Sequence, residues 1–553
     1  MRITYNDKLN KLLNPYLESL LKEKSSLEPE TLTLFDLFME DLDMGGRYGI
    51  FSEILEPRLE EIIREENIES IANLMDGRLN TLFRYMLGDE FAGLFHTYLQ
   101  LEARCPHTIG YDRRAQRSAH PSNHLDHARD AWLQFLKLRA TGFSVEAILK
   151  GGNTPEDTEE FSGYMNSSYW LAAQIAQGNE KVIEYLNQVL TSENNVHRLQ
   201  RWYLHAIAIS GHRPLLELEG KLLLAAKLQE GLRQAIVETM DEGCPESYLY
   251  LFSIIYNNGL QRFASVKRSI AVCTGIGEQD SSERITNKYV ELIWNFLNHP
   301  ETARNTLQSK DTVELYLALW SIGFYDTDEI RAIVPDIIRK GAKHQIQTLL
   351  YFLRCTQSSQ MNHLISKDAF EVWHDDPKVV AAILPLYMDG LYLSRYSDNK
   401  EAPTLSDYFE TPEEAVRHYG YLKQVYQSIS AKEIYSPYVF PWDCVVLTRS
   451  DVVLKMAYIA WMTNDIRLRE ELCTYLPALE SYNRASYIGI VLPRTESKVE
   501  QEYVLQSLGD RSADIRDEAY KVLSEMSLSP EQYQHIEELL RFKYSEMRIN
   551  AIN

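Results

Sequence analysis

The side chains that could do chemistry gather first in the stretch from Cys105 to His127. Its imidazole and thiol groups belong to Cys105, His107, His120, His124 and His127. His120 and His124 are four residues apart, a spacing that places two zinc ligands on one face of a helix. Because Pro121 follows His120 directly and no glutamate lies between the histidines, the pattern favours a polar loop with capping histidines. A metal site at His120, His124 and His127 is the less favoured alternative.

The same stretch is rich in arginine, with Arg104, Arg113, Arg114 and Arg117. A guanidinium group binds phosphate or carboxylate through two parallel hydrogen bonds. Arg113 and Arg114 are therefore candidate ligands for a phosphate or for an acidic partner. In the favoured interpretation they simply belong to the same polar loop.

A second group of candidates lies in residues 229–243 and 257–268. Glycine inside a helix costs up to about 1 kcal/mol relative to alanine, so Gly231 indicates a close helix crossing or a close ligand. The basic side chains that could line one surface are Arg233, Arg262, Lys267 and Arg268. The simpler interpretation is that Gly231 is a packing notch and that the basic side chains pair with acids. A basic ligand pocket near Arg233 and Arg262 is the alternative.

The clearest internal repeat lies between Tyr503 and Asn553. A leucine, a short turn, an acid, an arginine and an alanine follow one another twice, at Leu508, Asp514, Arg516 and Ala519 and at Leu540, Glu546, Arg548 and Ala551. The two arginines are 32 residues apart, a period typical of stacked helix pairs. We expect each arginine to begin a second helix, partly buried, with its guanidinium on a carbonyl or carboxylate of the adjoining repeat.

The terminal pattern resembles the HEAT-like repeat. Together with residues 229–243 and 257–268, it is similar to the N-terminal helical-repeat region of large bacterial proteins that carry further domains. Some of these proteins have a Trp-Gly-Arg module, and they have been linked with a molybdate-metabolism regulator. The resemblance implies helical repeats and supplies no catalytic residues. The chain departs from the family pattern at Cys273, where a tryptophan is expected.

Composition limits the function classes. The chain has 553 residues, is 45% hydrophobic and 25% charged, and has a formal net charge of -22. These fractions are typical of a folded soluble protein. The negative charge argues against the overall surface binding nucleic acid or membrane headgroups. A chain of this length is too long for one compact core, and an array of repeats avoids that limit.

The cysteines and the apolar segments indicate the cellular compartment of the protein. The six cysteines are scattered and form no CxxC pair, which favours a reducing compartment. The N-terminus leads into an amphipathic pattern and not into an apolar signal core. The longest apolar run, Val379 to Met388, is too short to span a bilayer. We therefore expect a cytoplasmic protein with no membrane contact.

Nearly every segment has the helical hydrophobic period. The predicted fold class is all-α, an α-solenoid of HEAT-like antiparallel helix pairs. We expect an N-terminal helical region over 1–190, a helical-repeat region over 191–393 and C-terminal HEAT-like repeats over 407–553. Because Asn553 interrupts what should be a second helix, the sequence predicts the N-terminal part of a longer protein.

Individual elements are also predicted. Leu215–Met240 should form one long helix, and Asp376–Tyr392 a helix kinked at Pro385. Residues from Tyr435 to Ser450, rich in proline and aromatic side chains, should form a connector. Between Thr312 and His374 the sequence predicts helices of 12 to 15 residues joined by short turns.

No nucleotide-binding loop, nucleophile elbow or dinucleotide fingerprint occurs in the sequence, so no cofactor is predicted. The favoured hypothesis is a non-catalytic interaction scaffold or regulatory solenoid. Its partners would be another protein and the C-terminal domains of the same longer chain. The alternative is a ligand-sensing or enzymatic helical domain with its pocket near Arg233 and Arg262.

Overall fold

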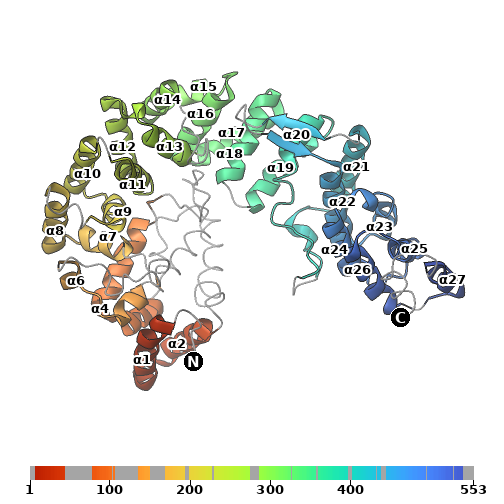
Figure 1. The fold of residues 1–553 in the computed structure, drawn as a ribbon, viewed down its shortest axis with the longest axis horizontal. Helices are drawn as coiled ribbons and strands as arrows, with labels where there is room; N and C mark the ends of the chain where they lie inside the picture. Colours follow the sequence, from red (N-terminus) through yellow and green to blue (C-terminus); the bar gives the residue numbers. More distant parts are fainter. Residues whose placement is uncertain are drawn as a thin grey trace. The chain divides into compact units, whose positions relative to one another are not determined.

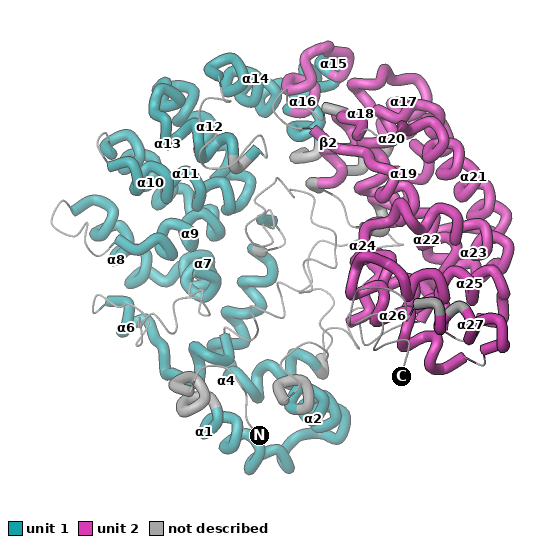
Figure 2. The backbone as a smooth tube through the Cα atoms, turned by 45° about the vertical axis from the view of Figure 1, so that its right-hand side comes forward, with its two compact units in different colours: residues 1–306, 317–327 teal, residues 307–316, 328–553 magenta. Residues whose placement is uncertain are grey.

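The structure is a computed structural model (Figure 1). It describes residues 7–43, 77–102, 104–105, 132, 135–149, 168–192, 199–226, 229–274, 286–325, 327–356, 359–396, 401–430, 433–437, 444–493, 495–526 and 528–539. The chain divides into two compact units, shown in Figure 2. Unit 1 comprises residues 1–306 and 317–327, and unit 2 comprises residues 307–316 and 328–553. The predicted boundaries near 190 and 400 stay predictions.

The described part of unit 1 is helical. Its helices are α1 (Asp7–Glu23), α2 (Pro29–Asp43), α4 (Gly77–Glu102), α6 (Val145–Leu149), α7 (Ser168–Ala176), α8 (Glu180–Thr191), α9 (Arg201–Ser210), α10 (Arg213–Ala225), α11 (Glu230–Asp241), α12 (Pro245–Asn258), α13 (Ala264–Cys273), α14 (Asn287–Asn298) and α15 (Pro300–Thr306). Short 3-10 helices lie at Lys24–Ser26 and Leu260–Arg262. Helix α16 (Thr312–Tyr325) contributes residues to both units.

Many helices of unit 1 pack against the helix two positions further along the chain. Helix α7 contacts α9, α9 contacts α11, and α11 contacts α13. In the same way α6 contacts α8, α8 contacts α10, α10 contacts α12, and α12 contacts α14. Each helix therefore buries its apolar stripe against neighbours on either side, as the 3.6-residue period of the sequence requires.

The turns of unit 1 depend on local capping and on glycine. The Asn179 side chain accepts a hydrogen bond from the Val182 backbone and so caps α8. A Cβ atom at Gly243 would lie 2.6 Å from the carbonyl oxygen of Ala208 in α9, so only glycine lets this turn pack there. At Gly231 a Cβ would meet no atom within 4 Å. The predicted close helix crossing at Gly231 is therefore wrong, because the close approach is made by Gly243.

The predicted single helix from Leu215 to Met240 is also wrong. It is broken between Ala225 and Glu230 into α10 and α11. The hydrophobic period continues across the break, and no proline or glycine marks its first residues. The carbonyl of Ala226 instead accepts a hydrogen bond from the Arg233 guanidinium.

Unit 2 is helical apart from one hairpin. Its helices are α17 (Thr327–Lys340), α18 (Lys343–Thr356), α19 (Ser359–Trp373), α20 (Pro377–Ile383), α21 (Pro412–Ser428), α22 (Arg449–Thr463), α23 (Ile466–Leu472), α24 (Ser481–Val491), α25 (Lys498–Ser507), α26 (Ala513–Ser524) and α27 (Pro530–Leu539). Short 3-10 helices lie at Leu405–Asp407 and Leu476–Ala478. The predicted helix over Asp376–Tyr392 is shorter than expected, because turns replace it between Leu384 and Gly390.

Strands β1 (Ile434–Pro437) and β2 (Cys444–Leu447) form an antiparallel pair in which Ile434 lies opposite Leu447. The predicted connector over Tyr435–Ser450 therefore contains a hairpin, which packs on α20. These are the only strands in the described residues. The predicted all-α class is confirmed, since every other regular element in the described residues is a helix.

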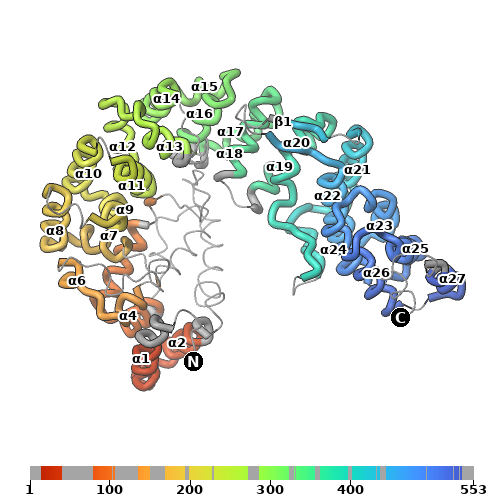
Figure 3. The backbone as a smooth tube through the Cα atoms, viewed as in Figure 1, coloured from red at the N-terminus to blue at the C-terminus, as the bar shows by residue number. Residues whose placement is uncertain are grey.

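The last helices, which Figure 3 shows toward the C-terminus, again contact the helix two positions further along the chain. Helix α22 contacts α24 and α24 contacts α26, while α23 contacts α25 and α25 contacts α27. Apolar side chains of α22 to α26 form the core, with Tyr487, Ile515 and Ala519 fully buried. Among the described helices, none is both long and apolar enough to cross a membrane.

Candidate functional site

The structure brings Arg233 and Arg262 together around one aromatic ring. The Arg233 guanidinium carbon lies 4.4 Å from the centre of the Phe263 ring, and that of Arg262 lies 4.7 Å from it. Both cations are also bound to backbone. Arg233 donates to the Ala226 carbonyl at 2.6 Å and to the Ser265 hydroxyl at 3.1 Å. Arg262 donates to the carbonyls of two residues in the preceding turn, Asn258 and Gly259.

These contacts hold the first turn of α11 and the end of α12 against the start of α13. Arg233 is only 7% exposed, and its donors face chain atoms. Arg268 forms an ion pair with Glu230, as the simpler interpretation of the sequence predicted. Lys267 is partly buried on the same helix. The four basic residues thus lie on neighbouring elements, and three of them bind atoms of the chain itself.

The other predicted candidates lie outside the described residues. These are Arg113, Arg114, His120, His124 and His127. The same holds for Arg548 in the second copy of the terminal repeat. The polar loop favoured for this stretch and its two alternatives, a metal site and a phosphate site, all stay predictions.

A set of titratable side chains that the sequence analysis missed lies between α19 and α21. His418 of α21 is fully buried, and its Nε2 atom lies 3.0 Å from a carboxylate oxygen of Glu371 in α19. The same oxygen accepts a hydrogen bond from Arg417 at 2.7 Å. Tyr421 donates to the second Glu371 oxygen at 3.2 Å. We call Glu371, Glu414, Arg417, His418 and Tyr387 the α19–α21 cluster.

The hydrogen bonds assign the protons in this cluster. Burial raises the pKa of Glu371, but the bonds from Arg417 and His418 outweigh it and hold that pKa below its usual value. Ionised Glu371 accepts only, so His418 Nε2 must donate. Burial lowers the pKa of His418, which leaves Nδ1 as an acceptor for the Tyr387 hydroxyl 2.8 Å away. Burial also raises the pKa of Tyr387 well above its usual value, so this hydroxyl keeps its proton.

A second buried histidine lies on α19, about two helix turns before Glu371. His363 of α19 is fully buried, and its Nε2 atom lies 2.8 Å from the Tyr408 carbonyl. Its Nδ1 atom accepts from the backbone of Met388, which has a positive φ of 51°. Burial lowers the pKa of His363 to about 4, so the ring is neutral. The ring therefore connects three segments without carrying charge.

The α19–α21 cluster contains donor atoms of the kind that bind a divalent cation. One atom each of Glu371, Glu414 and His418 lie within 4.8 Å of one another. However, both carboxylates already have protein cations, because Lys367 lies 3.0 Å from Glu414 and Arg417 lies 2.7 Å from Glu371. A metal would also require the opposite tautomer of His418. The arrangement therefore works as an ion-pair network that joins α19 to α21.

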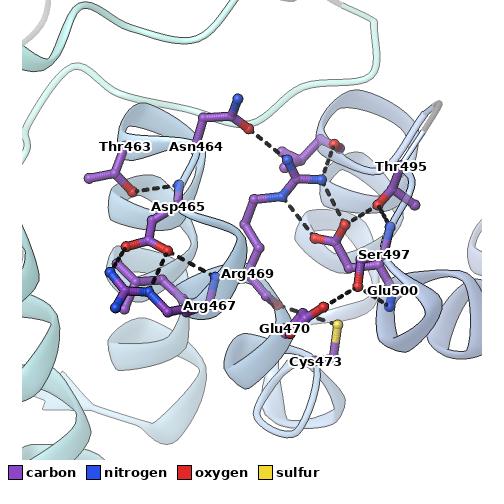
Figure 4. Close-up of polar contacts among 12 residues, drawn as sticks. Thr463, Asn464, Asp465, Arg467, Arg469, Glu470, Cys473, Thr495, Ser497 and Glu500 are labelled. Atoms are coloured by element: carbon purple, nitrogen blue, oxygen red, sulfur yellow. Dashed lines mark hydrogen bonds and ion pairs between the residues drawn. The ribbon is translucent and has the colours of Figure 1, made fainter.

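A similar network joins the helices near the end of unit 2 (Figure 4). Arg469 of α23 donates to both oxygens of Glu500 in α25, each at 2.8 Å. Glu500 is fully buried, and the Thr495 hydroxyl also donates to it. Because a buried carboxylate needs such partners, the pair holds two helices that are not adjacent in sequence.

Arg516 lies where the terminal repeat predicted, at the start of α26 and 8% exposed. Its guanidinium donates to the carbonyls of Asp510 and Arg511, both at 3.0 Å. These acceptors belong to the turn before α26. These two bonds close the residue's own turn, and the predicted bond to an adjoining repeat stays a prediction.

The sequence did contain a signal for the α19–α21 cluster. His363, Lys367 and Glu371 are spaced four residues apart on one helix, and so are Glu414 and His418 on another. Such spacing places side chains on one helix face. It does not show which two helices pack together, and that information came only from the fold.

The fold and the site together define a helical protein. Its helices contact the helix two positions further along the chain, and ion pairs such as Arg417–Glu371 and Arg469–Glu500 join some of them. The family model described as a family of unknown function (DUF5724) matches residues 34–553. The chain therefore belongs to that family. No curated protein and no solved structure matches the chain.

Proposed function

We propose that this chain is an α-solenoid of HEAT-like antiparallel helix pairs and that it acts as a protein-interaction scaffold or regulatory solenoid. The observation that supports it best is the contact between helices two positions apart, such as α9 with α11 and α24 with α26. Stacked helix pairs have this pattern, because each pair buries its apolar face against the next. Such arrays grow in one dimension and expose long surfaces to partners.

The internal use of the charged groups also supports a scaffold. Arg233, Arg516 and Arg469 donate to atoms of the chain. Glu371 and Glu500 accept from arginines. The arginine–glutamate pairs join neighbouring helices, while Arg233 and Arg516 hold turns of the chain. A catalytic group would instead need a free face toward a substrate.

Exposed aromatic side chains indicate where a protein partner would bind unit 2. Tyr392 is 67% exposed and Tyr396 is 73% exposed. The segment that holds them is attached to α24, because the Ser394 hydroxyl lies 3.1 Å from that of Tyr482. Tyr482 is itself 45% exposed. Tyrosine is enriched at protein interfaces, where a large ring gains contact area at little entropic cost. We call Tyr392, Tyr396 and Tyr482 the tyrosine surface.

The alternative is a ligand-sensing or enzymatic domain with a basic pocket near Arg233 and Arg262. The observation in its favour is that both guanidinium groups lie within 5 Å of the Phe263 ring centre. Against it, both groups donate to backbone carbonyls. An anionic ligand would have to replace bonds that close turns of the chain. The scaffold is therefore the better supported function. We propose that it acts in the cytoplasm of a bacterial cell.

Proximity labelling in cells, followed by binding assays with purified proteins, tests the proposal. We expect a protein partner that binds the purified chain directly. Replacing Tyr392 and Tyr396 by serine should weaken this binding at least about tenfold, since truncated hot-spot aromatics cost roughly 2 kcal/mol or more. Tyr533→Ser is the matched control, because Tyr533 is 56% exposed and lies on α27. If no labelled protein binds the purified chain, the scaffold proposal is wrong.

A further inference from the structure

A small cavity in unit 2 is lined by a lysine, Lys455, for which the described residues supply no ion-pair partner. The cavity has a volume of about 270 Å³ and lies between the end of α20, strand β2 and the first turns of α22. Its apolar wall includes Leu384, Pro385, Val446 and Leu454. The volume is close to the lower end of ligand pockets, roughly 300 Å³. The cavity therefore fits only a small, mainly apolar molecule.

Lys455 supplies the amine of this cavity. Within the part of the chain that the structure describes, Lys455 has no hydrogen bond or ion pair through its Nζ atom. Its nearest ring is that of Tyr458, whose centre lies 5.4 Å from Nζ. The other lysines of unit 2 with carboxylate partners include Lys367, with Glu414 at 3.0 Å. Lys455 therefore differs from them, because it lines the cavity without such a partner among the described residues.

The charges around Lys455 are few. Asp451 lines the cavity, and one of its oxygens already accepts from the backbone and hydroxyl of Thr448. Asp389, in the turn after α20, and His363 of α19 act on Lys455 only through longer-range electrostatics. The residues of α20 and β2 on the wall carry no charge. Burial thus outweighs the two carboxylates and lowers the pKa of Lys455 to about 8.

This change makes the neutral amine available near neutral pH. With a pKa near 8, about a quarter of the Lys455 side chains are neutral at pH 7.5. For an ordinary lysine the neutral fraction is roughly 0.1%. A neutral, desolvated amine is a nucleophile toward carbonyl carbon, as in enzymes that form Schiff bases.

We propose that Lys455 is a nucleophilic site that condenses with small apolar aldehydes to form an imine inside this cavity. The amine nitrogen attacks the carbonyl carbon, and the oxygen takes up a proton to give a carbinolamine. Loss of water then gives the imine. One aldehyde and one amine thus yield one imine and one water, without oxidation or reduction. Asp451, on the cavity wall, stabilises the protonated imine by its negative charge.

An aldehyde fits better than a carboxylate ligand. Asp451 and Asp389 already place negative charge near the amine, so a carboxylate would be repelled. The remaining wall is apolar and suits an alkyl chain. The proposal therefore goes beyond the scaffold function and does not depend on it.

Reductive trapping of the full-length chain tests the proposal. The purified protein is treated with pentanal and sodium cyanoborohydride at pH 7.5, and the modified lysines are mapped by peptide mass spectrometry. We expect Lys455 to be alkylated at least about tenfold faster than Lys340 and Lys521, given the difference in neutral amine. Those two side chains are 77% and 66% exposed. The rate at Lys455 should be half-maximal near pH 8.

Two variants separate the cavity from general reactivity. Lys455→Arg keeps the positive charge and should lose the label. Val446→Phe narrows the cavity at a position that is 37% exposed, so the fold should tolerate it. This variant should lower pentanal labelling of Lys455 and leave Lys340 unchanged. Labelling of Lys455 no faster than that of Lys340 would overturn the proposal. So would protection by pentanoate with no trapped imine, which would indicate a carboxylate site.

Discussion

Acid should destabilise unit 2 through one buried histidine. The His363 ring is fully buried, and burial lowers its pKa to about 4. In the unfolded chain the pKa is about 6.5. Between these two values the unfolded chain binds more protons, so the free energy of unfolding falls as the pH falls. His363 thus contributes its full stabilisation above about pH 6.5 and loses it progressively toward pH 4.

The size of the effect follows from the two pKa values. Lowering the pH from 7.5 to 5.0 should reduce the free energy of unfolding by about 2 kcal/mol through His363 alone. The limit below both values is about 3 kcal/mol. His418 adds a loss of the same sign, because burial lowers its pKa as well. A single-site variant is therefore needed to isolate the contribution of His363.

His363→Gln keeps a donor and an acceptor but cannot take up a proton. The variant should be less stable at pH 7.5, and its further loss between pH 7.5 and 5.0 should be about 2 kcal/mol smaller than that of the wild type. His299→Gln is the control, because His299 is 63% exposed and belongs to unit 1, outside the helices whose exchange is followed. Urea titrations read by hydrogen-exchange mass spectrometry of α19 and α21 report on unit 2 directly. Equal losses in the wild type and His363→Gln would refute the argument.

Three further substitutions and one control variant test the packing between helices, each by urea denaturation followed by hydrogen exchange. Arg516→Ala should lower the free energy of unfolding of unit 2 by roughly 1–3 kcal/mol, because a charged donor loses two carbonyl acceptors; no measurable change would mean that these bonds contribute nothing. Glu500→Gln should cost more, roughly 3–5 kcal/mol, since it leaves Arg469 buried without its carboxylate; a loss below that for Arg516→Ala would contradict this ranking. Gly243→Ala should destabilise unit 1 by roughly 1–3 kcal/mol through overpacking. Gly231→Ala meets no atom and should be neutral or stabilising, so equal effects of the two glycine variants would show that the close approach at Gly243 is incorrect.

Secondary structure was the most predictable property. The helices of 12 to 15 residues predicted between Thr312 and His374 are α16 to α19, which have 14 or 15 residues. A long apolar period specifies a helix even without tertiary information. The break between α10 and α11 was missed for the same reason, since the period continues across it. Among the described residues, the bond from Arg233 to the Ala226 carbonyl holds the end of α10 at this break.

The hairpin and the candidate sites were less predictable, because they depend on contacts between distant residues. Each strand of the hairpin has only four residues, too short for alternation to stand out. Glu371 and His418 are 47 residues apart in the chain, and their contact requires α19 and α21 to pack together. Lys455 gave no local signal either. Its unusual environment arises from α20 and β2, which lie elsewhere in the sequence.

Buried ionic groups recur between helices of unit 2, and apolar packing alone does not explain them. Replacing such a pair by apolar residues is often neutral or stabilising, so the pair is weak evidence for stability. Its geometry is nevertheless specific, because Arg469 can reach both oxygens of Glu500 only in one register of α23 against α25. An apolar stripe alone would tolerate a shift by one turn. A shifted helix would leave Glu500 buried without a cation, which costs far more than the lost packing. We therefore interpret the Arg469–Glu500 pair and the Glu371–His418–Tyr387 chain as devices that fix which turn of one helix faces its neighbour.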